Sequence, residues 1–171
     1  MADVLVESDH ESRIAPDDHV ALKLWLRLLT CTNLIESSVR QALRREFEST
    51  LPRFDLLAQL YRAQPGLKMS ELSRRLMVTG GNVTALADQL EKEGLLAREA
   101  VAGDRRATLL RLTPQGQRRF EDMAAGHEEW VVQLMNALSR DEQQQLLGLL
   151  GKLKSGLRSR PAAAPGIVEK R

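Results

Sequence analysis

The middle of the chain carries an alternation of helix and strand patterns that few folds can accommodate. Two short segments with apolar residues at helical spacing, 70–76 and 80–93, flank the tight connection Met77-Val78-Thr79. Two short segments of strand character, 95–100 and 108–112, follow with a charged turn between them. Two helices joined by a tight turn, and then a hairpin, predict a winged helix-turn-helix.

Longer helices are predicted on both sides of this unit, so the expected fold class is mainly α with a small β-hairpin wing. The first runs from near Pro16 to Phe47. Its apolar face comprises Leu24, Trp25, Leu28, Leu29, Cys31, Leu34, Ile35, Ala42 and Phe47. A face this wide needs cover on more than one side. It is either a core helix within one subunit or a helix shared with a second subunit, and this segment leaves both interpretations open.

Residues with known positional preferences mark the ends of the remaining helices. Pro52 opens a helix over 53–63, and a Gln64-Pro65-Gly66 turn ends it. Gly94 suits the position just after the second short helix, because glycine adopts a positive φ at low cost. The caps expected at helix starts are Ser70, Thr79, Thr113-Pro114 and Ser139, and the last two open helices that end near 138 and 158.

The overall composition is ordinary, and only the distribution of charge is informative. Hydrophobic residues make up 43% and charged residues 28% of the chain, with a formal net charge of +2. Residues 1–19 hold six acidic side chains against Arg13, whereas residues 68–119 hold ten basic against six acidic side chains. A basic middle is what phosphate binding requires, although such charges also occur on an ordinary solvated face.

Several classes of protein lack support in this sequence. Cys31 is the one cysteine, so no disulfide framework exists within the chain. No apolar run approaches the roughly 20 residues that span a bilayer, and the acidic N-terminus is unlike a secretory signal, so we expect a cytoplasmic protein without a membrane partner. His10, His19 and His127 are scattered and predict no metal site. No catalytic constellation or phosphate loop indicates an enzyme or a cofactor.

The start of the second short helix carries the residues best suited to read DNA. In a helix-turn-helix this helix enters the major groove, with its N-terminal residues at the base edges. Asn can bond both edge positions of adenine, Thr can bond a base or contact the thymine methyl, and glycines allow close approach to phosphate. The glycines could instead only shape the turn. The candidate residues are Thr79, Gly80, Gly81, Asn82 and Thr84.

Further DNA contacts are expected from the preceding helix and from the hairpin. Arg105 and Arg106 at the hairpin tip can enter a narrow minor groove, and Asp104 can orient one of them through a charge-assisted hydrogen bond. The same turn could instead simply be solvated. Phosphate contacts that fix the protein on DNA are expected from the preceding helix, although one of its arginines can pair internally. The candidates there are Ser70, Arg74 and Arg75.

The sequence resembles the MarR family of bacterial regulators over about residues 20–157. The most specific match is the wing, Asp104-Arg105-Arg106-Ala107-Thr108-Leu109-Leu110-Arg111-Leu112-Thr113, which fits the family pattern D-x-R…L-T. Segments 69–76 and 90–95 match its helix-turn-helix. The resemblance implies an obligate homodimer with interlocked first and last helices, which binds a pseudo-palindromic operator, usually as a repressor. It places Asn82 and Thr84 on recognition-helix contacts and Arg106 on the minor-groove arginine.

The resemblance also implies how the chain is divided. Residues 17–50 and 116–158 would form the dimerisation helices, and residues 51–115 the winged helix-turn-helix. The tails are acidic over 1–16 and rich in proline and alanine over 159–171, and we expect both to be loosely ordered.

A narrower likeness is to the branch of the family that controls aromatic-acid catabolism. It rests on residues 24–29, 53–55 and 77–84. It implies a small aromatic effector, such as an aromatic acid or a hydroxycinnamoyl-CoA thioester, bound between the pairing helices and the reading module. Each candidate could instead be ordinary core or surface. The candidates are Trp25, Leu29, Phe54, Tyr61 and Trp130, with Arg40 or Arg53 facing a carboxylate or phosphate.

Two alternative functions remain open. An oxidant-sensing regulator would react through Cys31, but this residue lies on an apolar stripe without an adjacent base, so we expect an inert thiol in the core. A nucleoid-type protein would bind DNA with little sequence preference, and a footprint confined to one palindrome would exclude it.

Overall fold

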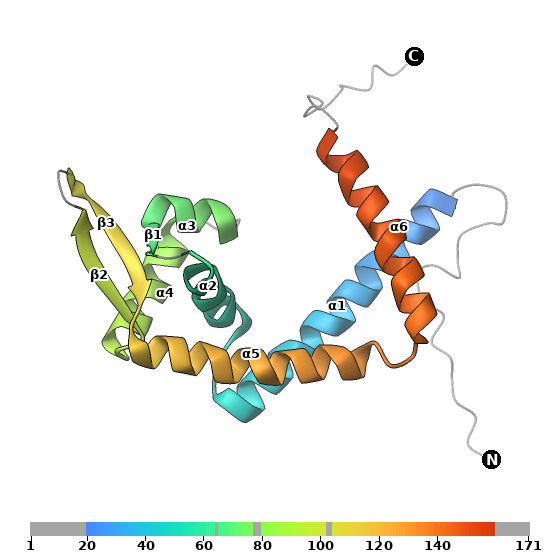
Figure 1. Cartoon of the computed structure of the whole chain (residues 1–171), viewed down its shortest axis with the longest axis horizontal. Coiled ribbons are helices and arrows are strands. Elements are labelled where there is room, and N and C mark those ends of the chain that lie inside the picture. Colours follow the sequence, from blue (N-terminus) through green and yellow to red (C-terminus); the bar gives the residue numbers. More distant parts are fainter. Residues whose placement is uncertain (1–19, 64, 77–79, 102–103, 160–171) are drawn as a thin grey trace. The chain divides into compact units, whose positions relative to one another are not determined.

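The computed structural model describes residues 20–63, 65–76, 80–101 and 104–159, which belong to two compact units divided between Val131 and Val132. A mainly helical fold with a β-hairpin is therefore confirmed. The predicted tails (except Ser159) and the expected start of the first helix lie outside the described residues. In chain order (Figure 1) the elements are α1 (Val20–Phe47), α2 (Leu51–Tyr61), β1 (Leu67–Lys68), α3 (Met69–Leu76), α4 (Gly80–Lys92), β2 (Leu96–Val101), β3 (Asp104–Leu112), α5 (Pro114–Leu134) and α6 (Arg140–Ser159).

The first unit contains the expected winged helix-turn-helix. Helix α3 contacts both α2 and α4, and a small antiparallel sheet packs beside them (Figure 1). Strands β2 and β3 form the predicted hairpin, with Leu96 opposite Leu112. A third strand was not expected, because β1 has two residues and cannot display a period. It pairs Leu67 with Leu110, which gives the sheet the order β1-β3-β2.

The hairpin differs from the prediction at its tip. Strand β3 begins at Asp104, so the backbone of Arg105 and Arg106 belongs to the strand and not to the predicted turn. A register shift at Ala100 and Val101 brings Val101 opposite Asp104, and this pairing extends the ladder toward the tip. The connecting residues 102–103 lie outside the described part of the chain.

One hydrophobic core holds the winged helix-turn-helix together. Its buried side chains come from the end of α1, from helices α2, α3, α4 and α5, and from the sheet. Leu72 of α3 and Leu90 of α4 are inaccessible to solvent, as is Leu110 of β3. Burying a leucine side chain contributes about 1.5–3 kcal/mol, so these contacts dominate the stability of the unit.

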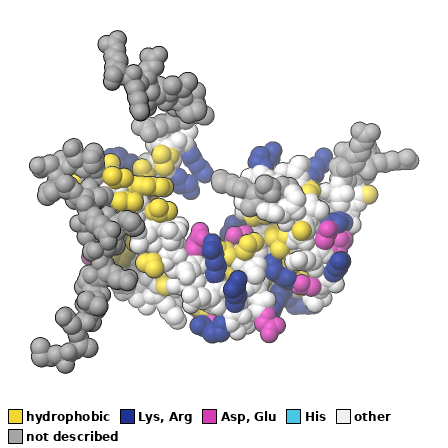
Figure 2. All heavy atoms as spheres, turned by 180° about the vertical axis from the view of Figure 1, so that it is seen from behind, with side chains coloured by type: hydrophobic (Ala, Val, Ile, Leu, Met, Phe, Trp, Pro, Cys, Tyr) yellow, Lys and Arg dark blue, Asp and Glu magenta, His cyan; other side chains and the backbone are white. Residues whose placement is uncertain are grey.

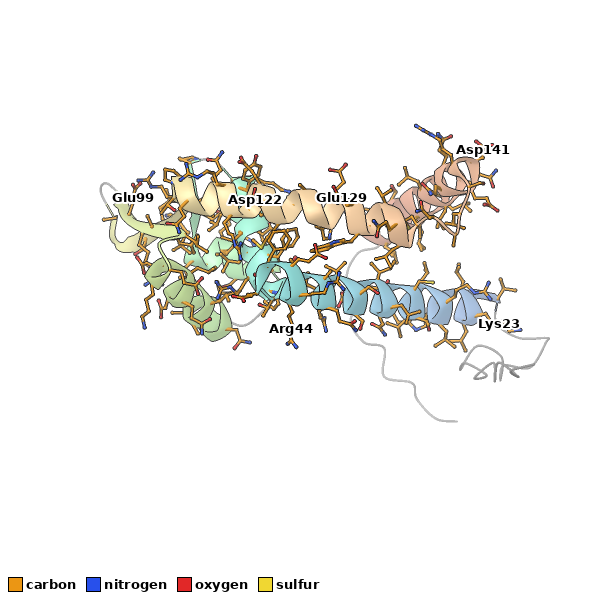
Figure 3. All side chains as sticks on the ribbon, turned by 90° about the horizontal axis from the view of Figure 1, so that it is seen from below. Lys23, Arg44, Glu99, Asp122, Glu129 and Asp141 are labelled. Atoms are coloured by element: carbon orange, nitrogen blue, oxygen red, sulfur yellow. The ribbon has the colours of Figure 1, made fainter. Side chains whose placement is uncertain are left out.

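Helix α1 has two different environments along its length. Near its C-terminal end Val39, Ala42 and Leu43 are buried in the core. Toward its N-terminal end, which Lys23 marks in Figure 3, apolar side chains such as Trp25 remain exposed. The core interpretation of the wide apolar face therefore holds for the C-terminal part of the helix, and the shared-helix interpretation stays a prediction for the N-terminal part. The expectation that Cys31 is a core thiol is wrong for the single chain, in which the residue is exposed.

The end of α4 is joined to the start of α5 by a compact set of backbone contacts. Gly94 adopts a φ of 74°, and its N–H and that of Leu95 donate to the carbonyls of Glu91 and Leu90, both at 2.9 Å. This is the predicted glycine C-cap. Thr113 caps α5 as predicted, because its Oγ1 accepts from Gly116 N at 3.0 Å. The same hydroxyl donates to the Gly94 carbonyl at 2.7 Å, and thus connects the two helices.

Two other helix ends differ from the prediction. Helix α3 begins at Met69, so Ser70 lies inside its first turn and is not the N-cap. Helix α5 ends at Leu134, about one turn before the predicted Leu138, because the chain tightens there into turns such as the one from Leu138 N to Met135 O at 3.1 Å.

The second unit consists of the end of α5 and the whole of α6. Ser139 caps α6 as predicted, since its N–H donates to Glu142 Oε2 at 2.8 Å and its hydroxyl accepts from Glu142 N at 3.4 Å. No residue of α6 is buried, although the helix carries a row of leucines. Figure 2 shows hydrophobic side chains at the surface of the molecule. Among the described residues no helix is long and apolar enough to cross a membrane, and no cluster of potential metal ligands forms.

We expect Thr113→Val to lower the free energy of unfolding by about 1–2 kcal/mol, because it removes an N-cap acceptor and the donor to Gly94. Thr113→Ser retains the hydroxyl and should lose less than half as much. Urea unfolding followed by circular dichroism measures both. Equal stability of the Val variant and the wild type would show that the hydroxyl does not hold the junction.

Candidate nucleic-acid interface

Helix α4 exposes the face that sequence reasoning assigned to DNA. Val83, Ala87 and Leu90 are buried and fix one side of the helix on the core. The N-terminal residues Asn82 and Thr84 are exposed on the other side. Among the described residues the Asn82 amide has no hydrogen-bond partner.

The two glycines at the start of α4 lie at its exposed end. A Cβ added at Gly81 would meet no atom within 4 Å, so packing within the chain does not require a glycine there. Gly80 is the first residue of α4. Thr79, the predicted cap and contact, lies outside the described residues. The open space at Gly81 favours close approach by another molecule over a role in shaping the turn.

Helix α3 presents two of its three candidate side chains freely. Ser70 and Arg74 are exposed. Arg75 instead pairs with Glu71 one turn earlier, with 2.6 Å between Arg75 Nη2 and Glu71 Oε1. This agrees with the expectation that one of the two arginines pairs internally. Arg74 is therefore the better placed of the two for a phosphate.

The wing is attached to α4 by charged side chains. Arg98 of β2 reaches two acids of α4, with its Nη2 on Asp88 and its Nη1 3.2 Å from Glu91 Oε2. On the hairpin itself Glu99, labelled in Figure 3, pairs with Arg111 across the two strands. These contacts hold the hairpin and the candidate recognition helix in one arrangement. The side chains of Asp104, Arg105 and Arg106 lie outside the described residues, and the orienting role of Asp104 stays a prediction.

The structure brings together only some of the predicted effector residues. Phe54 is buried and stacks on His127, with ring centroids 4.9 Å apart, and it also contacts Phe120 at 5.6 Å. Tyr61 lies 4.7 Å from the same Phe120 ring, and its hydroxyl donates to Glu121 Oε1 at 3.1 Å. These rings join α2 to α5 and form an aromatic cluster.

Acid and base groups lie beside this cluster. Partial burial, followed by the charge of Glu36, raises the pKa of Asp55, while the charges of His127, Arg40 and Arg62 act in the opposite direction. Burial lowers the pKa of His127, which the charge of Asp55 partly offsets. Arg40 itself pairs with Glu36 at 2.6 Å.

The other predicted effector residues lie elsewhere. Trp130 packs on Phe47 at the C-terminal end of α1, with centroids 6.0 Å apart. Trp25 lies 22 residues before Phe47 on α1, which is a distance of about 33 Å along the helix at 1.5 Å per residue. Trp25 and the nearby Leu29 are both exposed, so within one chain they cannot line a pocket with Trp130. Arg53 pairs with Glu93.

Sequence reasoning missed a cavity beside the recognition helix. It has a volume of about 410 Å³, and none of the predicted effector residues lines it. Its walls come from the start of α2, the end of α3 and one face of α4. The signal was weak, because Leu86 and Ala85 simply continue the apolar pattern of α4. The lining residues are Pro52, Asp55, Leu76, Asn82, Val83, Ala85, Leu86 and Gln89.

The chain is similar in sequence to known regulators. Residues 50–107 match the model of the MarR family. The uncharacterized HTH-type transcriptional regulator YkoM of Bacillus subtilis is 34% identical over 117 residues, which cover 68% of this chain and 74% of YkoM. The HTH-type transcriptional repressor MdtR of the same organism is 36% identical over 87 residues, or 51% of this chain and 56% of MdtR.

The chain is also similar in structure to a regulator solved on DNA. The complex of Staphylococcus aureus MepR with DNA aligns with a TM-score of 0.65 and 26% identity, over 81% of this chain and 99% of MepR. The residues that match the family model, 50–107, include the exposed face of α4.

Proposed function

The chain belongs to the MarR family of HTH-type transcriptional regulators, and we propose from this premise that it is a cytoplasmic homodimeric repressor that a small aromatic effector releases from a pseudo-palindromic operator. The observation that carries the DNA-reading role is the exposed start of α4. Asn82 is unpartnered there among the described residues, and Gly81 leaves open space beside it. A bidentate contact from an asparagine to adenine contributes about 1–3 kcal/mol of discrimination between bases.

The wing supports the same proposal through its attachment to α4. Because Arg98 binds Asp88 and Glu91, a helix seated in the major groove carries the hairpin toward the adjacent minor groove. We propose Arg106 as the minor-groove arginine, with Arg105 and Asp104 beside it. Ser70 and Arg74 of α3 would contact phosphates.

Uncovered apolar surface supports the homodimer. Leu34 of α1 is 64% exposed and Leu147 of α6 is 73% exposed. Monomeric proteins rarely leave apolar surface on this scale in water. We propose that a second copy of the chain covers it. The exposed apolar residues are Val20, Leu22, Leu24, Trp25, Leu29 and Leu34 on α1 and Leu146, Leu147, Leu149, Leu150, Leu153 and Leu157 on α6.

The cavity beside α4 supports regulation by a small molecule. Its volume of about 410 Å³ suits an aromatic acid or the acyl part of a CoA thioester. Asn82 is part of both the cavity wall and the proposed reading face, so an occupant competes with DNA for this side chain. Repression is supported by the name of MdtR. The aromatic cluster of Phe54 and Tyr61, with Arg40 nearby, remains a second proposed location for the effector.

We expect Arg106→Ala to weaken operator binding by about 1–3 kcal/mol and to lower the salt dependence of binding by about one ion. Asn82→Ala should relax the base preference at one position in each half-site. Selection from a random DNA library identifies the operator, and gel-shift titrations measure the affinities. Arg140→Ala, which removes a charge on α6, is the matched control.

Unchanged affinity and salt dependence of the Arg106 variant would remove the wing from the interface. A wild-type protein that enriches no sequence from the library would favour the nucleoid-type alternative.

We expect 4-hydroxycinnamate, benzoate or their CoA thioesters to raise the melting temperature of the protein and to release its operator, because a ligand of the folded state stabilises it. Gln89→Trp should fill the cavity rim and abolish the rise in melting temperature, whereas Gln89→Ala should retain it. Thermal shift and gel-shift assays measure both. A full response in the Trp variant would place the effector outside this cavity.

A further inference from the structure

Charged side chains join four helices at the C-terminal end of α4. Arg53, near the start of α2, donates from Nη1 to Glu93 Oε1 at 2.8 Å and from Nη2 to the other carboxylate oxygen. Glu93 directly follows the last residue of α4. A fork of two parallel hydrogen bonds fixes direction as well as distance, which a single ion pair does not.

Arg119 of α5 continues this chain of contacts to α1. Its Nη2 donates to the carbonyl of Phe47, the last residue of α1, and its guanidinium lies 5.5 Å from the centroid of the Phe47 ring. The hydrogen bonds from Arg53 lower the pKa of Glu93, and the charge of Arg119 adds to this effect. Glu93 is therefore bound by a guanidinium of α2 and lies within the electrostatic influence of one of α5.

The group is a shared structural element and not a set of separate surface pairs. Arg53, Glu93, Arg119 and Phe47 line a single cavity of about 290 Å³. The Arg53 side chain is only 20% exposed, and its buried Nε has no partner among the described residues. The guanidinium is thus oriented by packing and by one carboxylate. Lysine has no planar fork and cannot reproduce this geometry.

The group lies at the C-terminal end of α4, where it can control the angle of the whole helix. The turn at Gly94 and the bond from Thr113 fix where α4 ends, and the fork on Glu93 restrains how the helix turns about that point. Helix α4 has 13 residues and is about 20 Å long at 1.5 Å per residue. A tilt of roughly 10° about its C-terminal end would move the reading end by about 3.4 Å, the rise of one base pair.

We propose that Arg53 and Glu93, supported by Arg119, are specificity-determining positioning residues that set the spacing between operator half-sites which the protein accepts. This inference rests on the proposed function, because spacing has meaning only for two reading helices in a dimer. None of these residues needs to touch DNA. They act by fixing the angle at which each subunit presents α4 relative to α1 and α5.

The test is a set of operators whose half-sites are separated by the wild-type spacing and by one or two base pairs more or fewer. The proteins compared are the wild type, Arg53→Lys, Glu93→Gln and the exchanged pair Arg53→Glu with Glu93→Arg. Arg45→Lys is the matched control, because Arg45 forms an exposed ion pair with its neighbour Glu46 on α1 alone. Competition binding gives the affinity at each spacing, and affinity for a single half-site is measured in parallel.

We expect the wild type and Arg45→Lys to prefer one spacing at least about tenfold over its neighbours, a difference of about 1.4 kcal/mol. Arg53→Lys and Glu93→Gln should reduce this preference to about threefold or less while leaving single half-site affinity unchanged. The exchanged pair should recover part of the wild-type spacing preference.

Two results would overturn the inference. Variants that keep the wild-type spacing preference would show that the fork does not aim α4. Variants whose affinity falls equally at every spacing, and whose melting temperature also falls, would show that Arg53 and Glu93 only stabilise the fold. A wild type without any spacing preference would instead contradict the proposed dimeric reading, and the inference would fail with it.

Discussion

The left-handed turn at Gly94 is the constraint on which the reading part of the molecule depends. It ends α4, starts the path into β2, and offers its carbonyl to Thr113 at the start of α5. Gly116 of α5 packs closely against the backbone of Leu95, since a Cβ on Gly116 would lie 1.9 Å from the Leu95 carbonyl oxygen. A side chain at Gly116 would push the start of α5 away from Leu95, whereas a side chain at Gly94 would be strained by the φ of 74°. The C-terminal end of α4 is thus fixed in place, at the end that lies farthest from the proposed reading residues.

The rest of the structure divides between a packed winged helix-turn-helix and helices with exposed apolar side chains. The boundary runs through α1. Leu43 is inaccessible to solvent, whereas Leu34, nine residues earlier, is 64% exposed. A second copy of the chain is the proposed cover, and it would bring Cys31 out of solvent as well. In this account the same long helix anchors the reading unit and, at its other end, joins the two subunits.

Much of the fold could be predicted because local chemistry and periodicity agree. The caps at Gly94, Thr113 and Ser139 were readable, since each residue type has a specific backbone or hydrogen-bonding role. Strand β1 was not, because two residues have no period and pair only through the tertiary fold. The extension of β3 to Asp104 depends on a register shift that no residue type in this segment predicts.

The candidate site also contains features that the sequence predicts and features that it does not. The exposure of Asn82 followed from helical spacing alone. The partner of Arg53 did not, because Glu93 is 40 residues away in sequence and the two meet only when α2 packs beside the end of α4. For the same reason the sequence suggested an effector role for Arg53, and it gave no indication of the cavity that borders Asn82.

Dimethyl sulfate protection on the selected operator tests the central claim most directly, because the reagent methylates guanine N7 in the major groove and adenine N3 in the minor groove. If α4 reads the major groove and the wing enters the minor groove, guanines should be protected in two symmetric half-sites, with protected adenines flanking each. Protection of adenines alone, or uniform protection along the duplex, would contradict this account.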